Sequence, residues 1–115
     1  MPHFIIECNQ EITEKINPEE LLKTVYHAAD ATGLFEKSDI KVRIKVYEHY
    51  LNGGIKKDFI HVFGNILYGR SDDQKTLLSR KIVERLHHLS PQTEIVSINI
   101  RDFDKASYCN KNMIT

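Results

Sequence analysis

Two stretches of the chain repeat the same order of patterns: an apolar strand, an amphipathic helix and a second strand. The first stretch covers about residues 1–50 and the second about residues 57–101. In the strand expected over residues 40–46, apolar side chains alternate strictly with the cations Lys41, Arg43 and Lys45. A strand–helix–strand unit joins two parallel strands through a crossover helix. The pattern therefore predicts an α/β (α+β) fold, with tandem βαβ units forming a four-stranded sheet and two helices on one face.

The ends of both helices carry local signals. Asn17 followed by Pro18 predicts an N-cap and first helical position, and Ser71 with Gln74 predicts a capping box. The Thr-Gly pair at residues 32–33 and the Ser-Pro pair at residues 90–91 predict where the helices end. The other strands are expected over residues 2–8, over residues 59–68 and around Val96, Ile98 and Ile100.

Size and charge restrict the class of protein. The 115 residues predict one domain, residues 1–115, with a polar tail over residues 102–115 that we expect to wrap a surface or a neighbouring subunit. Sixteen basic and sixteen acidic residues balance, which differs from the basic footprint of a nucleic-acid-binding protein. The sequence predicts no membrane span and no signal peptide. Cys8 and Cys109 lack metal-ligand spacing and favour free thiols in a soluble cytoplasmic protein.

One face of the predicted sheet has no helix to cover it. We expect this face to be too apolar for exposure to solvent, because of strand residues such as Phe4, Ile6, Val62 and Ile66. Contact with other subunits would cover it.

Pro2 follows the initiator methionine. Removal of Met1 would leave Pro2 with a secondary amine, whose reference pKa is roughly 7.7–8.0. A cationic neighbour or an apolar pocket lowers that pKa, and a neutral amine at pH 7 can act as a general base. The alternative is that proline at this position only permits removal of the methionine.

Four segments together carry a family resemblance. They are the opening Met-Pro-His-Phe-Ile-Ile-Glu-Cys, the Ala-Thr-Gly-Leu-Phe of residues 31–35, the Lys-Val-Arg of residues 41–43 and the Gly-Arg-Ser of residues 69–71. With them, essentially the whole chain resembles the 5-carboxymethyl-2-hydroxymuconate isomerases of the tautomerase superfamily. The resemblance implies a homotrimer whose sheets line a barrel with the helices outside. It also implies a cofactor-independent isomerase for a small carboxylate substrate in homoprotocatechuate degradation.

The resemblance implies Pro2 and Arg70 as catalytic residues. Arg70 directly precedes the predicted cap of the second helix, where backbone N–H groups and the helix dipole favour an anion. An arginine there can add a bidentate contact to a substrate carboxylate. The alternative is a solvated arginine paired with Asp72 or Asp73.

Arg43 and Lys41 are the candidate substrate-binding residues. Lys41 stands where the family strand motif resembles Arg-x-Arg, and lysine offers charge without a planar fork. A solvated cationic strand face is the alternative for both. We interpret His3 as structural and the His87–His88 pair as a favourable interaction with a helix end. Four aromatic residues are expected mostly in the core, with one of them possible as a pocket wall: Phe4, Phe59, Phe63 and Tyr68.

Three functions remain open from the sequence. The first is an isomerase of di- or tricarboxylate dienols with Pro2 as base. The second is a broad keto–enol tautomerase acting on substrates such as phenylpyruvate. The third is a non-catalytic trimeric binding module, which applies if Met1 is retained, because the Pro2 nitrogen is then an amide without basicity.

Overall fold

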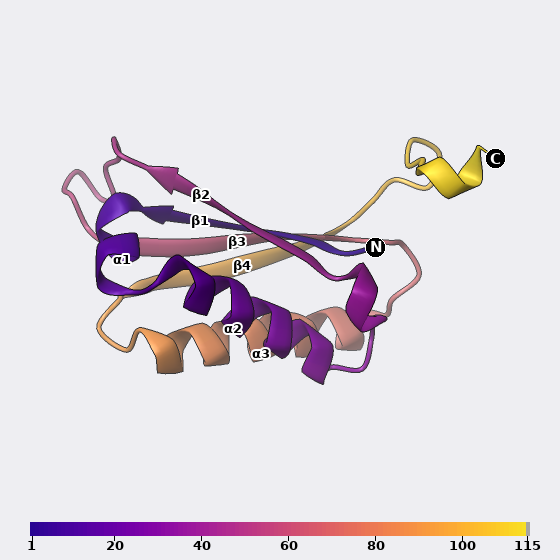
Figure 1. Ribbon diagram of the computed structural model, residues 1–115, viewed down its shortest axis with the longest axis horizontal. Coiled ribbons are helices and arrows are strands. Elements are labelled where there is room, and N and C mark those ends of the chain that lie inside the picture. The colour runs from indigo at the N-terminus through magenta and orange to yellow at the C-terminus, as the bar shows by residue number, and fades with distance from the viewer. Residues whose placement is uncertain (115) are drawn as a thin grey trace.

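The computed structural model describes residues 1–114, which form a four-stranded sheet with two long helices on one face (Figure 1). The strands are β1 (His3–Asn9), β2 (Lys41–Tyr47), β3 (Phe59–Ile66) and β4 (Ile95–Asp102). The long helices are α2 (Pro18–Ala31) and α3 (Asp72–Leu89). The sequence patterns missed the short helix α1 (Gln10–Lys15) and two 3₁₀ turns, Lys37–Asp39 and Lys111–Met113.

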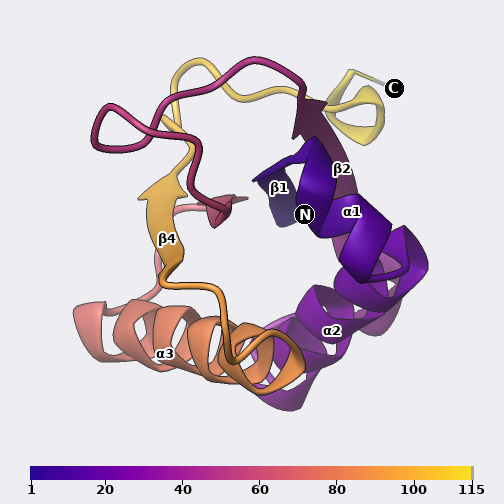
Figure 2. The same ribbon diagram turned by 90° about the vertical axis from the view of Figure 1, so that its left-hand side faces the viewer.

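The sheet has the strand order β2-β1-β3-β4. β1 pairs with β2 in parallel, β3 pairs with β4 in parallel, and the two halves meet where β1 and β3 run antiparallel. The end-on view shows both long helices on the same side of the strands (Figure 2). The predicted tandem βαβ architecture is therefore confirmed.

Local side-chain caps define both helix starts where the sequence predicts them. The Asn17 side chain accepts a hydrogen bond from the Glu19 amide at 2.9 Å. At α3, the Ser71 hydroxyl accepts from the Gln74 amide at 3.2 Å, and the Gln74 side chain accepts from the Ser71 amide at 2.9 Å. This reciprocal pair satisfies two N–H groups that the first helical turn leaves without partners. Arg70 consequently lies directly before an ordered helix start.

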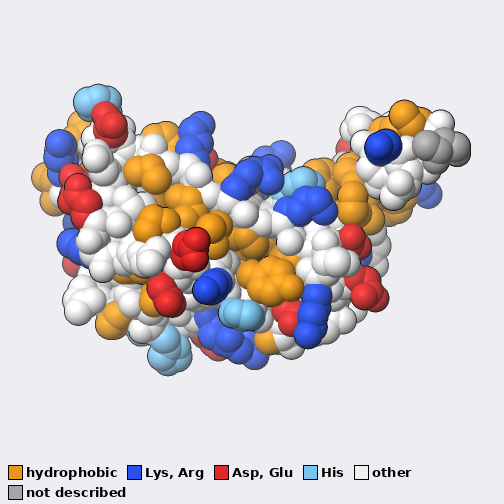
Figure 3. Space-filling view, in the orientation of Figure 1, with side chains coloured by type: hydrophobic (Ala, Val, Ile, Leu, Met, Phe, Trp, Pro, Cys, Tyr) orange, Lys and Arg blue, Asp and Glu red, His pale blue; other side chains and the backbone are white. Residues whose placement is uncertain are grey.

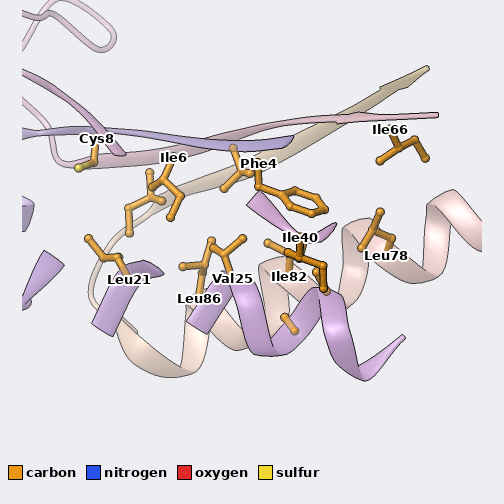
Figure 4. Close-up of a cluster of buried hydrophobic side chains, with 14 of the residues drawn as sticks. Phe4, Ile6, Cys8, Leu21, Val25, Ile40, Ile66, Leu78, Ile82 and Leu86 are labelled. Atoms are coloured by element: carbon orange, nitrogen blue, oxygen red, sulfur yellow. The ribbon is translucent and has the colours of Figure 1, made fainter. Parts of the chain in front are cut away.

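The core lies between the sheet and the helices (Figure 4). Phe4 and Ile6 of β1 meet Val25 of α2 and Ile82 and Leu86 of α3, and all five are fully buried.

The expectation that Phe4, Ile6, Val62 and Ile66 form the uncovered face is wrong. All four side chains are fully buried in the core beneath the helices. Alternation along a strand determines which residues share a face, but it does not say which face the helices cover.

The uncovered sheet face is consequently more polar than expected. Ile5 and Phe63 are cross-strand neighbours at its centre and are half-buried. Arg43 lies beside Ile5 in the register, and the ring of His61 packs edge-on against Phe63 with 4.5 Å between ring centroids. This face therefore combines a small apolar centre with basic and polar side chains.

The end of the chain projects away from the body of the domain. Ile66 ends β3 two residues earlier than expected, and its carbonyl accepts a hydrogen bond from the Phe103 amide at 2.7 Å. Beyond Phe103 the chain forms a separate projection (Figures 1 and 3). Met113 and Ile114 near its end are 59% and 76% exposed. The projection contributes to a radius of gyration of 14.9 Å, against about 13 Å for a compact chain of this length.

The buried side chain of Asn9, at the end of β1, forms a hydrogen-bond network at the opposite end of the sheet. The Asn9 amide nitrogen lies 2.8 Å from an Asp58 oxygen and 3.0 Å from both Glu11 and the Tyr50 hydroxyl, while its oxygen accepts from the Phe59 amide. Hydrogen bonds, chiefly from Tyr50, lower the pKa of Glu11 to about 2. This network attaches α1 to the loop before β3, which explains how a helix of six residues persists at that position.

Both cysteines are free, as the sequence predicts. Cys8 is buried in the core, and burial raises the pKa of its thiol to about 11. Cys109 is exposed in the tail.

Candidate active site

A pocket of about 290 Å³ lies where the chain begins. Met1 and Pro2 line one side, and Arg70 and the loop after α2 line the others. Because β1 and β2 run parallel, the start of β2 lies beside the start of β1, and the Lys41 amide donates to the Pro2 carbonyl at 3.1 Å. Pro2 is buried at the base of this arrangement. The fold thus brings Pro2 and Arg70, which are 68 positions apart in the chain, into one pocket.

The amino-terminal amine belongs to Met1 in this structure and lies at the edge of the pocket. Its nitrogen is 3.8 Å from an Asp39 carboxylate oxygen. Burial lowers the pKa of this amine below its usual value, Lys41 and Arg70 lower it further, and Asp39 acts in the opposite direction. The Met1 and Pro2 nitrogens are separated by three covalent bonds. A Pro2 amine exposed by methionine removal would therefore lie close to the same charged groups.

Arg70 is held by the loop after α2. One guanidinium nitrogen donates to the Leu34 carbonyl at 2.6 Å, and the guanidinium carbon lies 5.1 Å from the centre of the Phe35 ring. Phe35 in turn packs edge-on against the core residue Phe4. Among residues 1–114, the ion pairs do not include one between Arg70 and either Asp72 or Asp73. The guanidinium is therefore oriented by a backbone carbonyl and an aromatic face.

Lys41 lies near the pocket. Its ammonium donates to the Asp39 carbonyl at 2.9 Å and lies 3.9 Å from the Met1 sulfur. Lys41 is not among the residues that line the pocket, but its ammonium lies beside Met1 and Asp39, which are.

Arg43 points elsewhere. One of its guanidinium nitrogens lies 3.1 Å from Nδ1 of His3, on the uncovered sheet face. An arginine can only donate, so this His3 nitrogen is the unprotonated acceptor. Burial, followed by the charges of Arg43 and Lys41, lowers the pKa of His3, in agreement with a neutral ring. The fold of the chain does not bring Arg43 together with Pro2 and Arg70.

The residues that the sequence patterns missed are those of the pocket wall. Leu34, Phe35, Glu36 and Asp39 line it, and Phe35 is the aromatic residue that contacts Arg70. The position of Asp39 could have been inferred, since a residue just before a parallel partner strand lies beside the start of the first strand.

The aromatic residues expected in the core are distributed differently. Phe4 is buried, as expected, but Phe59 and Phe63 are only half-buried, and Tyr68 is 44% exposed. None of these four is among the residues that line this pocket. Phe59 and Phe63 occupy the strand positions that alternate with the core positions, so they share the face without helices.

The His87–His88 pair lies in the last turn of α3, and the ring of His88 lies 2.9 Å from the Glu84 carbonyl. Residues 1–114 contain no group of three or more His, Cys, Asp or Glu side chains placed to hold a metal ion. The same part of the chain has no helix with the length and apolar character needed to cross a membrane.

Comparison with known proteins covers almost the whole chain. The family model of 5-carboxymethyl-2-hydroxymuconate isomerase matches residues 2–115. No curated protein sequence matches the chain.

Solved structures share the fold at low sequence identity. A 5-carboxymethyl-2-hydroxymuconate isomerase from Deinococcus radiodurans R1 is 23% identical, with a TM-score of 0.81 over 96% of this chain and 88% of that one. A 5-carboxymethyl-2-hydroxymuconate delta-isomerase is 16% identical, with a TM-score of 0.76 over 96% and 87%. An asymmetric trimer of fused wild-type 4-OT is 13% identical, with a TM-score of 0.80 over 95% and 92%.

Proposed function

Because the chain belongs to the 5-carboxymethyl-2-hydroxymuconate isomerase family, we propose that it isomerises a dienol or unsaturated keto acid with Pro2 as the general base. The observation that carries this proposal is the pocket that Pro2 and Arg70 line together at the amino terminus, with the Lys41 ammonium 3.9 Å from the sulfur of Met1 at its edge. The substrate class we propose is a di- or tricarboxylate dienol of the 5-carboxymethyl-2-hydroxymuconate type, formed in the degradation of homoprotocatechuate.

The proposed reaction needs one base and a stabilised anion. The neutral Pro2 amine removes the hydroxyl proton of the dienol, and the electron pair moves through the conjugated chain to form the ketone. The resulting ammonium returns the proton to a carbon of that chain. Arg70 binds a carboxylate and stabilises the negative charge that develops during transfer. No resident cofactor takes part in this scheme.

The Pro2 nitrogen can act as a base only if Met1 is removed, because it is otherwise an amide nitrogen. Burial and the nearby cations lower the pKa of the amino-terminal amine, so more of it is neutral near pH 7 than in an exposed peptide. We propose that removal of Met1 transfers this environment to Pro2. Retention of Met1 would instead favour the non-catalytic binding module.

Turnover of two substrate types tests the proposal. The protein tested is one whose intact mass shows that Met1 has been removed. We expect its kcat/KM for ketonisation of 5-carboxymethyl-2-hydroxymuconate to be higher than its kcat/KM for ketonisation of enol-phenylpyruvate. Ultraviolet absorbance follows both reactions. A protein of the trimmed mass that isomerises neither compound would contradict the proposed reaction.

A broad keto–enol tautomerase is the second candidate, and the position of Arg43 favours it. Within one subunit the pocket contains Arg70 but not Arg43, whose guanidinium contacts His3 on the open sheet face. One arginine is enough for a monoacid such as phenylpyruvate. Faster turnover of the monoacid would support this candidate over the polycarboxylate isomerase.

We propose a homotrimer as the working assembly, with the open sheet faces toward its interior as in a barrel. The half-buried Ile5 and Phe63 on that face and the exposed Met113 and Ile114 of the tail supply apolar surface for such contacts. The similarity of the fold to fused 4-OT trimers supports the same choice. We also propose a cytoplasmic location, where free thiols such as Cys8 and Cys109 persist.

Sedimentation equilibrium measures this assembly. We expect three times the monomer mass at micromolar concentration, and a lower mass after deletion of residues 103–115, because the tail carries exposed apolar side chains. A full-length chain that stays monomeric at that concentration would contradict the trimer and any pocket shared between subunits.

A further inference from the structure

The acidic side of the pocket has no role in the reaction described above. Glu36 and Asp39 both line the pocket, opposite in charge to Arg70 and Lys41. Asp39 is the one in contact with the amino terminus, at 3.8 Å from the amine. A carboxylate in a pocket for carboxylate substrates weakens their binding by repulsion, so its presence calls for a compensating role.

The backbone holds Asp39 beside the amino terminus. Asp39 ends the 3₁₀ turn Lys37–Asp39, and its amide donates to the Glu36 carbonyl at 3.0 Å. Two residues later, the Lys41 amide donates to the Pro2 carbonyl, which joins this segment to the first strand. Neither hydrogen bond involves Met1, so we expect its removal to leave this segment attached beside residue 2.

The cations near the amino terminus disfavour protonation of the amine. Arg70 and Lys41 suit a carboxylate substrate, but both disfavour an ammonium ion beside them. The proposed reaction passes through such an ammonium, because the amine holds the substrate proton between its removal and its return. Of the two acidic residues that line the pocket, Asp39 is the one that contacts the amino-terminal amine, and its negative charge favours the ammonium. His3 instead faces Arg43 on the open sheet.

From this arrangement we propose that Asp39 is a positioning residue, whose carboxylate stabilises the ammonium formed when the Pro2 amine takes the substrate proton. The inference rests on the proposed function of Pro2 as base. Loss of the Asp39 charge makes the amine a weaker base, so more of it is neutral at low pH but each proton transfer is less favourable. The effect is modest, because the Asp39 side chain is 46% exposed to solvent.

Nitrogen NMR of protein labelled with ¹⁵N-proline tests this directly. The chain has three prolines, and only an amino-terminal Pro2 nitrogen can titrate, because Pro18 and Pro91 nitrogens are amides. In Asp39→Asn we expect the titration midpoint of the Pro2 nitrogen, read from its chemical shift against pH, to move to lower pH. We also expect the pH dependence of kcat/KM to move in the same direction and the plateau of kcat to fall by roughly two- to fivefold.

Two variants serve as controls. Asp39→Glu keeps the charge, so we expect its Pro2 titration midpoint and its kcat plateau to lie close to those of the parent protein. Glu36→Gln removes a charge from the same pocket wall at a residue that has no part in the contact with the amine, and we expect the midpoint to stay at its parent value.

The outcomes separate this inference from the proposed function. An unchanged Pro2 midpoint in Asp39→Asn would overturn the role of Asp39, whatever the turnover. A lowered midpoint in a protein that isomerises no keto acid would support the electrostatic contact and contradict the proposed reaction instead. A lowered midpoint with a lowered kcat plateau would support both.

Discussion

Replacing Pro2 with alanine is expected to reduce kcat by about a hundredfold or more while the protein stays folded. The secondary amine becomes a primary amine with different basicity and without the ring that holds the nitrogen in the pocket. Some basicity remains, so we expect impairment rather than complete loss. The backbone hydrogen bond from Lys41 to the carbonyl of residue 2 does not depend on the side chain, and the fold should therefore persist.

The measurement requires chains of known amino terminus. Intact mass must show that Met1 is absent from both the parent and Pro2→Ala, and a thermal unfolding curve establishes that the variant is folded. Pro18→Ala is the matched control, because Pro18 occupies the first position of α2 and does not line the pocket. Unchanged turnover in the trimmed Pro2→Ala protein would rule out Pro2 as the base.

If Pro2 is the base, the kcat/KM of the parent protein should depend on pH. A base must be neutral to accept a proton, so kcat/KM should rise with pH through the pKa of the Pro2 amine and then level off. Burial lowers the pKa of the Met1 amine, Asp39 opposes this and Lys41 and Arg70 add to it, and we expect the Pro2 amine to share this environment. The rise should therefore be complete at a lower pH than the ordinary range of α-amino groups, roughly 7.7–8.0, would give.

Replacing Arg70 with alanine is the second large effect we expect. It removes a charge-assisted contact worth roughly 1.5–3 kcal/mol, which corresponds to a ten- to hundredfold loss in kcat/KM. The backbone groups at the start of α3 remain, so part of the anion site survives the change. Arg70→Lys should lose much of the same activity, because an ammonium cannot both hold the Leu34 carbonyl and present a planar fork to a carboxylate.

Substrate charge distinguishes the roles of the three cations. The loss in Arg70→Ala should be larger for a substrate with several carboxylates than for phenylpyruvate. Lys41→Ala should cost less, since its ammonium offers no fork, and Arg43→Ala should lie between the two. Because Arg43 lies outside the pocket of its own subunit, we expect its effect to be confined to polycarboxylates and to the assembled protein.

Arg80→Ala is the control for these charge changes, because Arg80 is exposed on α3 and does not line the pocket. Equal losses for mono- and polycarboxylates would show that the cations do not recognise the additional carboxylates. The polycarboxylate isomerase would then be contradicted and the broad tautomerase supported.

The sequence alone determined the features that depend on near neighbours in the chain. The Asn17 cap and the Ser71–Gln74 capping box each involve residues two or three positions apart, and both form as expected. Alternation over residues 40–46 identified β2 to within one residue at each end. The short helix α1 escaped detection because its residues Glu11 and Lys15 bind Tyr50 and Asp58, about forty positions away.

Only the tertiary structure decided which strand face the helices cover and which cations share the pocket. A period of two is the same for either face, so Phe4 and Ile6 could be assigned to the wrong one. Arg43 and Lys41 lie on one strand, yet their side chains reach different surroundings, His3 for one and Asp39 for the other. The contact of Arg70 with Leu34 and that of Asp39 with the amino terminus each join segments more than thirty residues apart. The Arg70 contact depends on how the two halves pack together, and the Asp39 contact depends on the parallel pairing of β1 with β2.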